Sequence, residues 1–239
     1  MIPKIIHYCW FGKGKKNRQI NKCIKSWKKY CPDYQIIEWN ESNFDVNCNN
    51  YCKKAYELKK YAFVSDMARL HAITKFGGVY LDTDLELTKN IDLFLNQAFI
   101  SWESDTILGT AILGCEKGNK FFSDFLSIYD NIEFEKEDGL YLTNTLRITM
   151  FASKFGLVQN NSLQEINGIK IYPKEYFYPK DQSTGIVKIQ KETHGIHHFT
   201  VSYISKTDRF RQKVYHFIFK YFGKKFAEKM YNIFGRKNI

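Results

Sequence analysis

The chain has 239 residues, of which 44% are hydrophobic and 17% are aromatic. This composition excludes an intrinsically disordered chain, and the length suffices for one sizeable α/β core. No run of about 18 apolar residues occurs, so no segment is predicted to span a membrane. The amino terminus lacks the apolar core and cleavage site of a signal peptide, which predicts a cytosolic protein.

The formal net charge of +11 is concentrated at one end of the chain. Residues 206–239 hold ten of the 36 Lys and Arg residues and two of the 25 acidic residues, a net charge of +8. Residues 1–205 carry the remaining +3. We therefore predict a near-neutral domain over residues 1–205, followed by a basic tail over residues 206–239.

The six cysteines do not show the paired spacing of a zinc site. In a reducing compartment we expect all of them to be free thiols, several of them buried. They are Cys9, Cys23, Cys31, Cys48, Cys52 and Cys115.

Apolar periodicity and turn residues predict an alternation of strands and helices. The expected strands are 3–11, 34–39, 79–81, 98–102, 110–113, 169–172 and 186–189. The expected helices are 17–30, 51–76 (in one or two pieces), 119–129 and 140–155. The first half alternates strand, helix and strand, which predicts a mixed, mostly parallel sheet flanked by helices.

Two carboxylates follow the central strand at its end. A helix-like stretch ends at the glycine pair Gly77 and Gly78, and a short apolar strand follows. Asp82 and Asp84 come at the end of that strand. Because alternate residues of a strand point the same way, the two side chains are expected to project together. Mg²⁺ and Mn²⁺ prefer such oxygen ligands and complete their shell with substrate phosphates. The alternative is a polar turn after an edge strand.

Three segments carry a resemblance to a known family. They are IPKIIHYCWFG at the start, AFVSDMARLHAITKFGGVYLDTDLEL in the middle and HHFTVSY near residue 200. Together they resemble glycosyltransferase family 32, whose members use nucleotide sugars and include bacterial capsular polysaccharide transferases. The resemblance covers residues 1–205 and implies an α/β fold of the GT-A, Rossmann-like type for that catalytic domain.

The resemblance implies roles for the acidic and basic residues. Asp84 would bind the divalent cation directly, and Asp82 would reach the cation through water or contact the ribose and sugar hydroxyls. Asp66 would bind donor sugar hydroxyls, Arg69 would lie beside the sugar and diphosphate, and Ser65 would line the same wall. Without the resemblance, the spacing of Asp66 and Arg69 is that of an i,i+3 surface ion pair.

Aromatic residues on the first and central strands are candidates for nucleotide contacts. Relatives stack an aromatic ring on uracil from the position of Trp10; the alternative is a core tryptophan. The backbone of Tyr8 would touch the edge of the base. Tyr80 would pack on the nucleotide or fill the sheet, and His7 is interpreted as a core histidine.

Candidates also lie in the second half of the chain. His197 and His198 offer imidazole to Mn²⁺, and in an extended segment only one of them can face the site. The family pattern continues to Ser-Trp near the diphosphate, whereas this chain has Ser202-Tyr203, so only Ser202 keeps the implied role. Asn144 would reach the anomeric carbon or cap a helix.

The implied activity is a metal-dependent, retaining transfer of a hexose or N-acetylhexosamine from a nucleotide sugar, with UDP favoured. The cofactor would be Mn²⁺ or Mg²⁺, and the acceptor a glycan, expected to be a lipid-linked capsule or surface polysaccharide intermediate. The sequence offers no outstanding general base, which agrees with a front-side transfer.

The tail combines basic residues with an aromatic face at helical spacing, as in helices that lie on anionic membranes. We therefore expect a cytoplasmic enzyme held peripherally at the inner face of the plasma membrane by residues 206–239. The alternative is a helix pair that packs on the domain.

Two other functions are compatible with parts of the sequence. A phosphohydrolase of the haloacid-dehalogenase type also has Asp-x-Asp after a strand, but it requires Thr or Val where this chain has Glu86. A non-enzymatic nucleic-acid- or membrane-binding protein would explain the basic tail. Because no DNA- or RNA-binding motif occurs, we predict no nucleic-acid partner.

Overall fold

The structure is a computed structural model that describes residues 1–135, 142–182 and 184–200. The α-helices are α1 (Arg18–Tyr30), α2 (Asn50–Glu57), α3 (Tyr61–Phe76), α4 (Lys120–Ser127) and α5 (Asn144–Ser153). The strands are β1 (Ile5–Cys9), β2 (Gln35–Trp39), β3 (Gly78–Leu81), β4 (Leu85–Leu87), β5 (Phe99–Trp102), β6 (Leu108–Cys115), β7 (Gln164–Ile166), β8 (Ile169–Tyr172) and β9 (Gly195–His197). The predicted tail, residues 206–239, lies outside the described residues.

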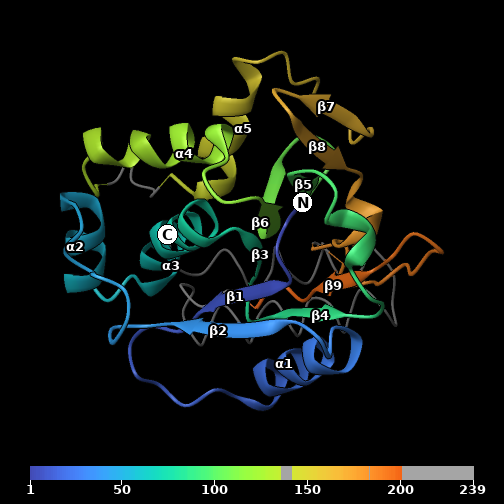
Figure 1. Ribbon diagram of the computed structural model, residues 1–239, viewed down its shortest axis with the longest axis horizontal. Coiled ribbons are helices and arrows are strands. Elements are labelled where there is room, and N and C mark those ends of the chain that lie inside the picture. The colour runs from blue at the N-terminus through green and yellow to red at the C-terminus, as the bar shows by residue number, and fades with distance from the viewer. Residues whose placement is uncertain (136–141, 183, 201–239) are drawn as a thin grey trace, which may run out of the picture.

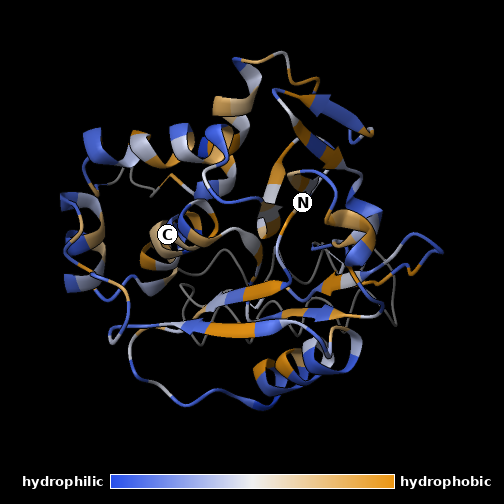
Figure 2. Ribbon diagram, in the orientation of Figure 1, coloured by the Kyte–Doolittle hydropathy of each residue, from blue (hydrophilic) through white to orange (hydrophobic). Residues whose placement is uncertain are grey.

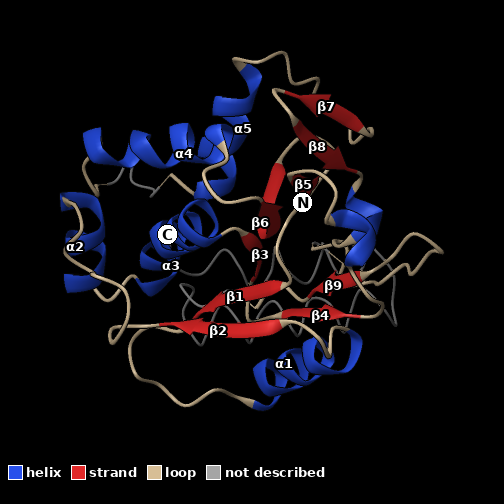
Figure 3. Ribbon diagram, in the orientation of Figure 1, coloured by secondary structure: helices blue, strands red, loops and turns tan. Residues whose placement is uncertain are grey.

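Seven strands form one mixed sheet in the order β2-β1-β3-β6-β5-β8-β7 (Figure 1). The pairs β1–β2, β1–β3 and β5–β8 are parallel. The pairs β3–β6, β5–β6 and β7–β8 are antiparallel. The predicted α/β class, with a mixed sheet flanked by helices, is confirmed, and Figure 3 shows helices on both sides of the strands.

Each face of the sheet has its own hydrophobic core. One core joins the sheet to α2, α3, α4 and α5, and the other joins it to α1 and β4. Figure 2 shows apolar residues concentrated on the central strands and polar residues dominating α2. Burial of apolar surface on both faces is the main stabilising contribution in such a fold.

Helix α1 forms as its sequence predicts. Asn17 caps it by accepting a hydrogen bond from the Ile20 N–H at 3.0 Å, which satisfies one of the free donors of the first turn. Ile20, Cys23 and Trp27 lie on one side and are buried. The predicted helical segment 51–76 is divided at residues 58–60, where Lys59 has a φ of 56°.

The glycine pair between α3 and β3 is required by close packing as well as by backbone conformation. Gly77 has a φ of 69° and Gly78 a φ of 110°. A Cβ atom at Gly78 would lie 2.7 Å from the Ile5 carbonyl oxygen, and one at Gly77 would lie 2.8 Å from the Lys117 nitrogen. The pair therefore lets the chain leave the helix and enter the sheet directly beside β1.

Two features differ from the sequence prediction. The strand expected at 186–189 is wrong: only an isolated bridge between Lys180 and Val187 is present there. Three-residue strands β4, β7 and β9 were not predicted, because three residues are too few to establish a period of two. Among the described residues, none of the helices combines the length and apolar content needed to cross a bilayer.

Candidate active site

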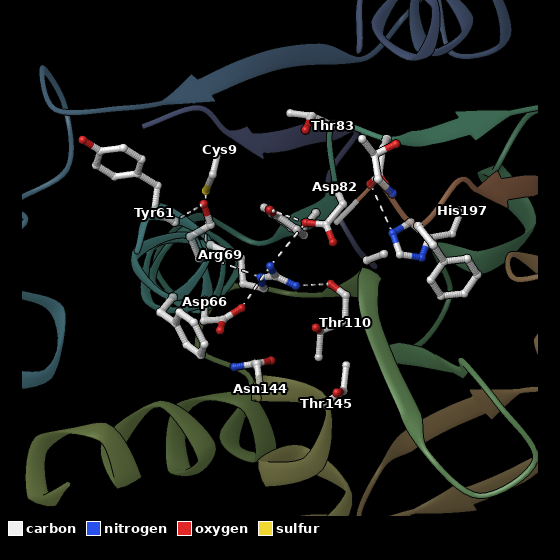
Figure 4. Close-up of a pocket in the computed structure, with 18 of the residues that line it drawn as sticks. Cys9, Tyr61, Asp66, Arg69, Asp82, Thr83, Thr110, Asn144, Thr145 and His197 are labelled. Carbon is white, nitrogen blue, oxygen red and sulfur yellow. Dashed lines mark hydrogen bonds and ion pairs between the residues drawn. The ribbon is translucent and has the colours of Figure 1, made fainter. Parts of the chain in front are cut away.

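A cavity of about 440 Å³ opens at the carboxyl ends of β1, β3 and β5 and the start of α5 (Figure 4). Ligand sites in α/β proteins occur at this edge of the sheet, and the volume is in the range typical of small-molecule sites. The cavity brings together nine sequence-predicted residues: Trp10, Ser65, Asp66, Arg69, Tyr80, Asp82, Asp84, Asn144 and His197.

The two aspartates of the motif lie in the turn that follows β3. The Leu85 N–H donates to the Asp82 carbonyl oxygen at 2.9 Å and closes this turn. Strand β4 then pairs with β9 so that Leu85 lies opposite His197. Candidate ligand atoms of Asp82, Asp84 and His197 all lie within 4.8 Å of one another. The aspartates therefore converge as predicted, but through a turn after the strand.

Asp84 is fixed by two polar contacts. Its Oδ1 lies 3.1 Å from His197 Nε2, and its Oδ2 accepts the Thr200 N–H at 2.5 Å. Burial alone would raise the pKa of Asp84, but His197 and the Thr200 N–H hold it below its ordinary value. Burial alone would lower the pKa of His197, but Asp84 raises it above its ordinary value. The environment of this pair therefore favours the negative charge of Asp84 and the positive charge of His197.

The donor atoms at this position fit a divalent cation. Two carboxylates and one imidazole suit Mn²⁺ better than Ca²⁺, and the His197 Nδ1 atom is buried with no partner in the described structure. His198 turns away from the two aspartates, and its Nε2 lies 2.9 Å from Glu86 Oε2. Of the two adjacent histidines, the structure brings His197 to the aspartates.

Arg69 joins the two halves of the cavity. Its Nη2 lies 3.1 Å from Asp66 Oδ1 and 3.3 Å from Asp82 Oδ1, and its Nη1 donates to the Thr110 carbonyl oxygen at 2.6 Å (Figure 4). The Asp66–Arg69 pair is buried, so the surface ion pair considered from the sequence is wrong. Burial raises the pKa of Asp66 to about 7, against the opposing charge of Arg69.

An irregularity between β5 and β6 supplies backbone groups to the cavity. The register of this pair shifts between Ile100 and Ser101, so residues 110–112 of β6 have no partner on β5. The Thr110 carbonyl is instead bonded by Arg69, and the Ala111 N–H donates to Tyr178 Oη at 3.0 Å. Such interruptions of a ladder are common beside active sites because they redirect the chain.

Tyr80 and Trp10 occupy different positions in the cavity. Tyr80 is buried, donates to Asp82 Oδ1 at 2.8 Å and has its ring 4.7 Å from the Arg69 guanidinium carbon. It therefore fills the sheet and also faces the same side as Asp82. Trp10 is only partly buried, and its Nε1 donates to the Gly14 carbonyl at 2.6 Å. Its ring lies at the cavity rather than in the core.

Two predicted residues of the first strand lie away from the cavity. The Tyr8 side chain is buried and donates to Glu38 Oε2 at 2.5 Å. His7 is a core histidine as predicted: Nε2 lies 2.8 Å from the Gly77 carbonyl oxygen, and Nδ1 accepts from the Trp39 indole.

Asn144 and Ser65 are both at the cavity wall. Asn144 begins α5, is 3% exposed and donates from Nδ2 to Tyr129 Oη at 2.7 Å. Its Oδ1 is buried and has no partner among the described residues. Thr143, not Asn144, is the capping residue. The Ser65 hydroxyl donates to the Tyr61 carbonyl oxygen. Ser202 lies outside the described residues.

Sequence reasoning missed several residues that line the cavity, among them Glu103. It follows directly after a strand predicted at 98–102, just as Asp82 follows 79–81, so the same rule would have found it. Tyr61 and Thr145 also line the cavity, at helix starts that carried no sequence signal of function.

The fold and one sequence region are those of glycosyltransferases. Residues 17–103 match the family model described as "Glycosyltransferase sugar-binding region containing DXD motif". The solved structure of PaToxG glycosyltransferase aligns with a TM-score of 0.51 at 18% identity, covering 64% of this chain and 68% of that one. The predicted GT-A fold is thereby confirmed, and residues 17–103 are similar to the sugar-binding region of DXD glycosyltransferases.

Curated relatives agree with this class. Inositol phosphoceramide mannosyltransferase 3 of Schizosaccharomyces pombe is 28% identical over 129 residues, covering 50% of this chain and 35% of the relative. Human lactosylceramide 4-alpha-galactosyltransferase is 28% identical over 120 residues, covering 48% and 32%. The chain thus spans about a third of the length of these two relatives. A glycosyltransferase of Acanthamoeba polyphaga mimivirus is 24% identical over 187 residues, covering 75% and 74%.

Proposed function

We propose that the protein is a metal-dependent, retaining glycosyltransferase of family 32, which moves a hexose or N-acetylhexosamine from a UDP-sugar to a glycan acceptor. One observation carries this proposal: the Asp82, Asp84 and His197 cluster shares a cavity with Arg69 and an accessible Trp10. A cation site, a buried guanidinium and an aromatic ring are the groups needed to bind a diphosphate attached to a nucleoside.

Asp84 and His197 would hold the cation, with Asp82 beside them. A bound Mn²⁺ or Mg²⁺ would neutralise the negative charge that develops on the departing diphosphate. The contacts with His197 and the Thr200 N–H hold the pKa of Asp84 below its ordinary value and so favour the carboxylate form that binds a cation, whereas His197 would bind as the neutral imidazole.

The other residues bind and orient the donor. Arg69 presents a permanent positive charge beside Asp82, and its donors would contact a phosphate or sugar oxygen. Asp66 would accept hydrogen bonds from sugar hydroxyls. Trp10 offers a face on which uracil can stack, an interaction worth about 1–3 kcal/mol. Asn144 has an unpartnered Oδ1 that would accept from a sugar hydroxyl near the anomeric carbon.

The pairing of the cavity carboxylates supports the proposal of a retaining transfer. In a front-side transfer the departing diphosphate and the incoming hydroxyl share one face of the sugar, and stabilising the diphosphate matters more than a strong base. Asp66, Asp82 and Asp84 are each paired with Arg69 or His197. These three are thus committed to binding rather than to proton abstraction.

The acceptor proposed is a lipid-linked glycan at the cytoplasmic face of the plasma membrane, such as a capsule or surface polysaccharide intermediate. Two relatives carry ceramide lipids in their names, which supports a lipid-linked acceptor. The basic residues of 206–239 would hold the protein at an anionic membrane. Equal pelleting with anionic liposomes by the chain with and without residues 206–239 would reject this role.

The proposed activity is tested by a donor screen. Thermal unfolding is followed with a panel of UDP- and GDP-sugars, each with and without Mn²⁺, and the stabilising donors are then assayed for release of the nucleoside diphosphate. We expect stabilisation by UDP-sugars that requires the metal and is lost in Asp84→Ala. A protein that no nucleotide sugar stabilises, with or without metal, would contradict the proposal.

A further inference from the structure

Among the strands that border the cavity, the strand that ends before Glu103 is the one farthest from the strand that ends before Trp10. Strands β1, β3, β6 and β5 are consecutive neighbours in the sheet, and neighbouring strands are about 4.8 Å apart. Trp10 follows β1, Asp82 follows β3, and Glu103 follows β5. Strand β5 is therefore two strands, about 10 Å, beyond the cation cluster on the side away from Trp10.

The order of these strands matches the order of the parts of the proposed donor, from base to sugar, with the acceptor beyond the sugar. With the base on Trp10 and the diphosphate at Asp82, the transferred sugar lies beside Arg69 and Thr110, at the start of β6. The next strand, which ends in Glu103, then borders the space that a sugar acceptor must enter. Thr145, from α5, lines the same cavity at its lower side (Figure 4).

The backbone of Glu103 is held in place by its surroundings. Its N–H donates to the Ile107 carbonyl oxygen at 2.8 Å, which closes the loop between β5 and β6. A Cβ atom on Gly109 would lie 2.9 Å from the Glu103 Cβ and 2.3 Å from Tyr178 Oη. Only a glycine at 109 leaves room for both side chains, so the position of Glu103 is built into the fold.

Glu103 differs from the other cavity carboxylates in its partners. Asp66 and Asp82 pair with Arg69, and Asp84 pairs with His197. The Glu103 carboxylate makes no hydrogen bond or ion pair to any described residue. Burial is also the chief cause of its raised pKa. A partly buried carboxylate without a partner is costly unless a ligand supplies hydrogen-bond donors.

Building on the proposed function, we propose that Glu103 binds the acceptor sugar by accepting a hydrogen bond from one of its hydroxyl groups. Glu103 thereby selects a hydroxyl-bearing acceptor over water and places it against the donor. Asp66 and Arg69 hold the donor sugar, whereas Glu103 serves the second substrate.

The test separates donor binding from the choice of acceptor. The probes are UDP with Mn²⁺ for binding by calorimetry, and the stabilising UDP-sugar with methyl hexosides or glycerol as acceptors in competition with water. The variants are Glu103→Ala and Glu103→Gln, whose amide oxygen still accepts a hydrogen bond. Glu165→Ala, on the exposed side of β7, is the matched control, and thermal unfolding verifies that each variant is folded.

We expect Glu103→Ala to bind UDP and Mn²⁺ within about twofold of the wild type and to shift the ratio of transfer to hydrolysis towards hydrolysis by about 10- to 100-fold. Glu103→Gln is expected to fall between Glu103→Ala and the wild type. An unchanged ratio in Glu103→Ala overturns the inference, and so does a loss of UDP affinity as large as the loss of transfer. A wild-type protein that neither binds UDP nor consumes UDP-sugars would instead refute the proposed function itself.

Discussion

His197 and Asp84 are 113 residues apart in the chain, yet Nε2 of the histidine lies 3.1 Å from Oδ1 of the aspartate. The contact depends on the pairing of β4 with β9, in which Leu85 lies opposite His197. The neighbouring His198 is one residue out of phase and reaches Glu86 instead. Asp84 lies in the turn before β4 and not in the ladder, so the conformation of that turn, together with the pairing that brings residue 197 beside it, determines which imidazole reaches the aspartates.

The two adjacent histidines therefore form a matched pair of variants. His197→Ala should lower Mn²⁺-dependent donor turnover by at least about 10-fold, because it removes a nitrogen ligand from the cluster. His198→Ala should leave the metal dependence close to that of the wild type, since its ring bonds to Glu86. The measurement is turnover against Mn²⁺ concentration, and equal effects of both substitutions would contradict the assignment.

Arg69 is expected to support stability as well as donor binding. Arg69→Ala leaves the buried Asp66 and the partly buried Asp82 without the cation that bridges them, which should cost about 3–5 kcal/mol in the free energy of unfolding. Arg69→Lys keeps the charge but cannot contact both carboxylates and Thr110 together. Its free energy of unfolding should therefore lie between those of the wild type and Arg69→Ala. Urea denaturation measures both effects. A fully stable Arg69→Ala protein would show that the network contributes little.

Asp66 should make stability depend on pH in the protein without donor or metal. Its pKa is about 7 in the folded state against 3.8 when exposed, so the folded state binds this proton more tightly. The stabilisation is fully present below about pH 4 and is lost as pH rises through 7. Asp66→Asn mimics the protonated form. We expect the unfolding temperature of the wild type to fall progressively relative to that of the variant from pH 4 to pH 8, and to be several degrees lower at pH 8.

Gly78 should tolerate a side chain worse than Gly156, another glycine of positive φ. Gly78→Ala places a Cβ 2.7 Å from the Ile5 carbonyl oxygen, whereas Gly156, with a φ of 89°, has open space around it. Gly156→Ala should cost about 1–2 kcal/mol from backbone strain alone. Gly78→Ala should cost clearly more in the same denaturation experiment. Equal losses would mean that β1 and β3 move apart at no cost.

Trp10 is expected to contribute to nucleotide affinity without contributing much to the core. Trp10→Ala should weaken UDP binding by about 5- to 150-fold if uracil stacks on the indole. Tyr8→Phe removes a hydroxyl that bonds Glu38 outside the cavity, so it should leave UDP affinity unchanged. Calorimetry with UDP and Mn²⁺ distinguishes the two. An unaltered affinity in Trp10→Ala would place the base elsewhere.

Local patterns predicted the elements that are long enough to show a period. Helix α1 and strands β1 and β2 lie within the predicted ranges, and Asp82 and Asp84 follow the central strand as expected. The reversal of β6 between β3 and β5 was not predictable, because its run of apolar residues reads the same in either direction. All residues of β6 are buried, so the pattern of apolar residues does not indicate the direction of the strand.

The contacts within the site were predictable only where the residues are close in sequence. The i,i+3 spacing of Asp66 and Arg69 indicated a pair, but not that Arg69 would also reach Asp82 and Thr110. Those contacts depend on the tertiary packing of α3 against the sheet. The choice between His197 and His198 likewise depends on the pairing of β4 with β9 and on the turn that holds Asp84, neither of which a single sequence reveals.

The region shared with the sugar-binding family model ends at residue 103, but the proposed cation cluster also includes an imidazole from residue 197. A protein can therefore carry the whole shared region and still lack one third of the ligand set. A survey of related genomes for working enzymes should ask for a histidine that pairs beside the motif, because the acidic signature alone would also retain inactive copies. The short β4–β9 ribbon is thus a criterion for distinguishing working enzymes from inactive copies.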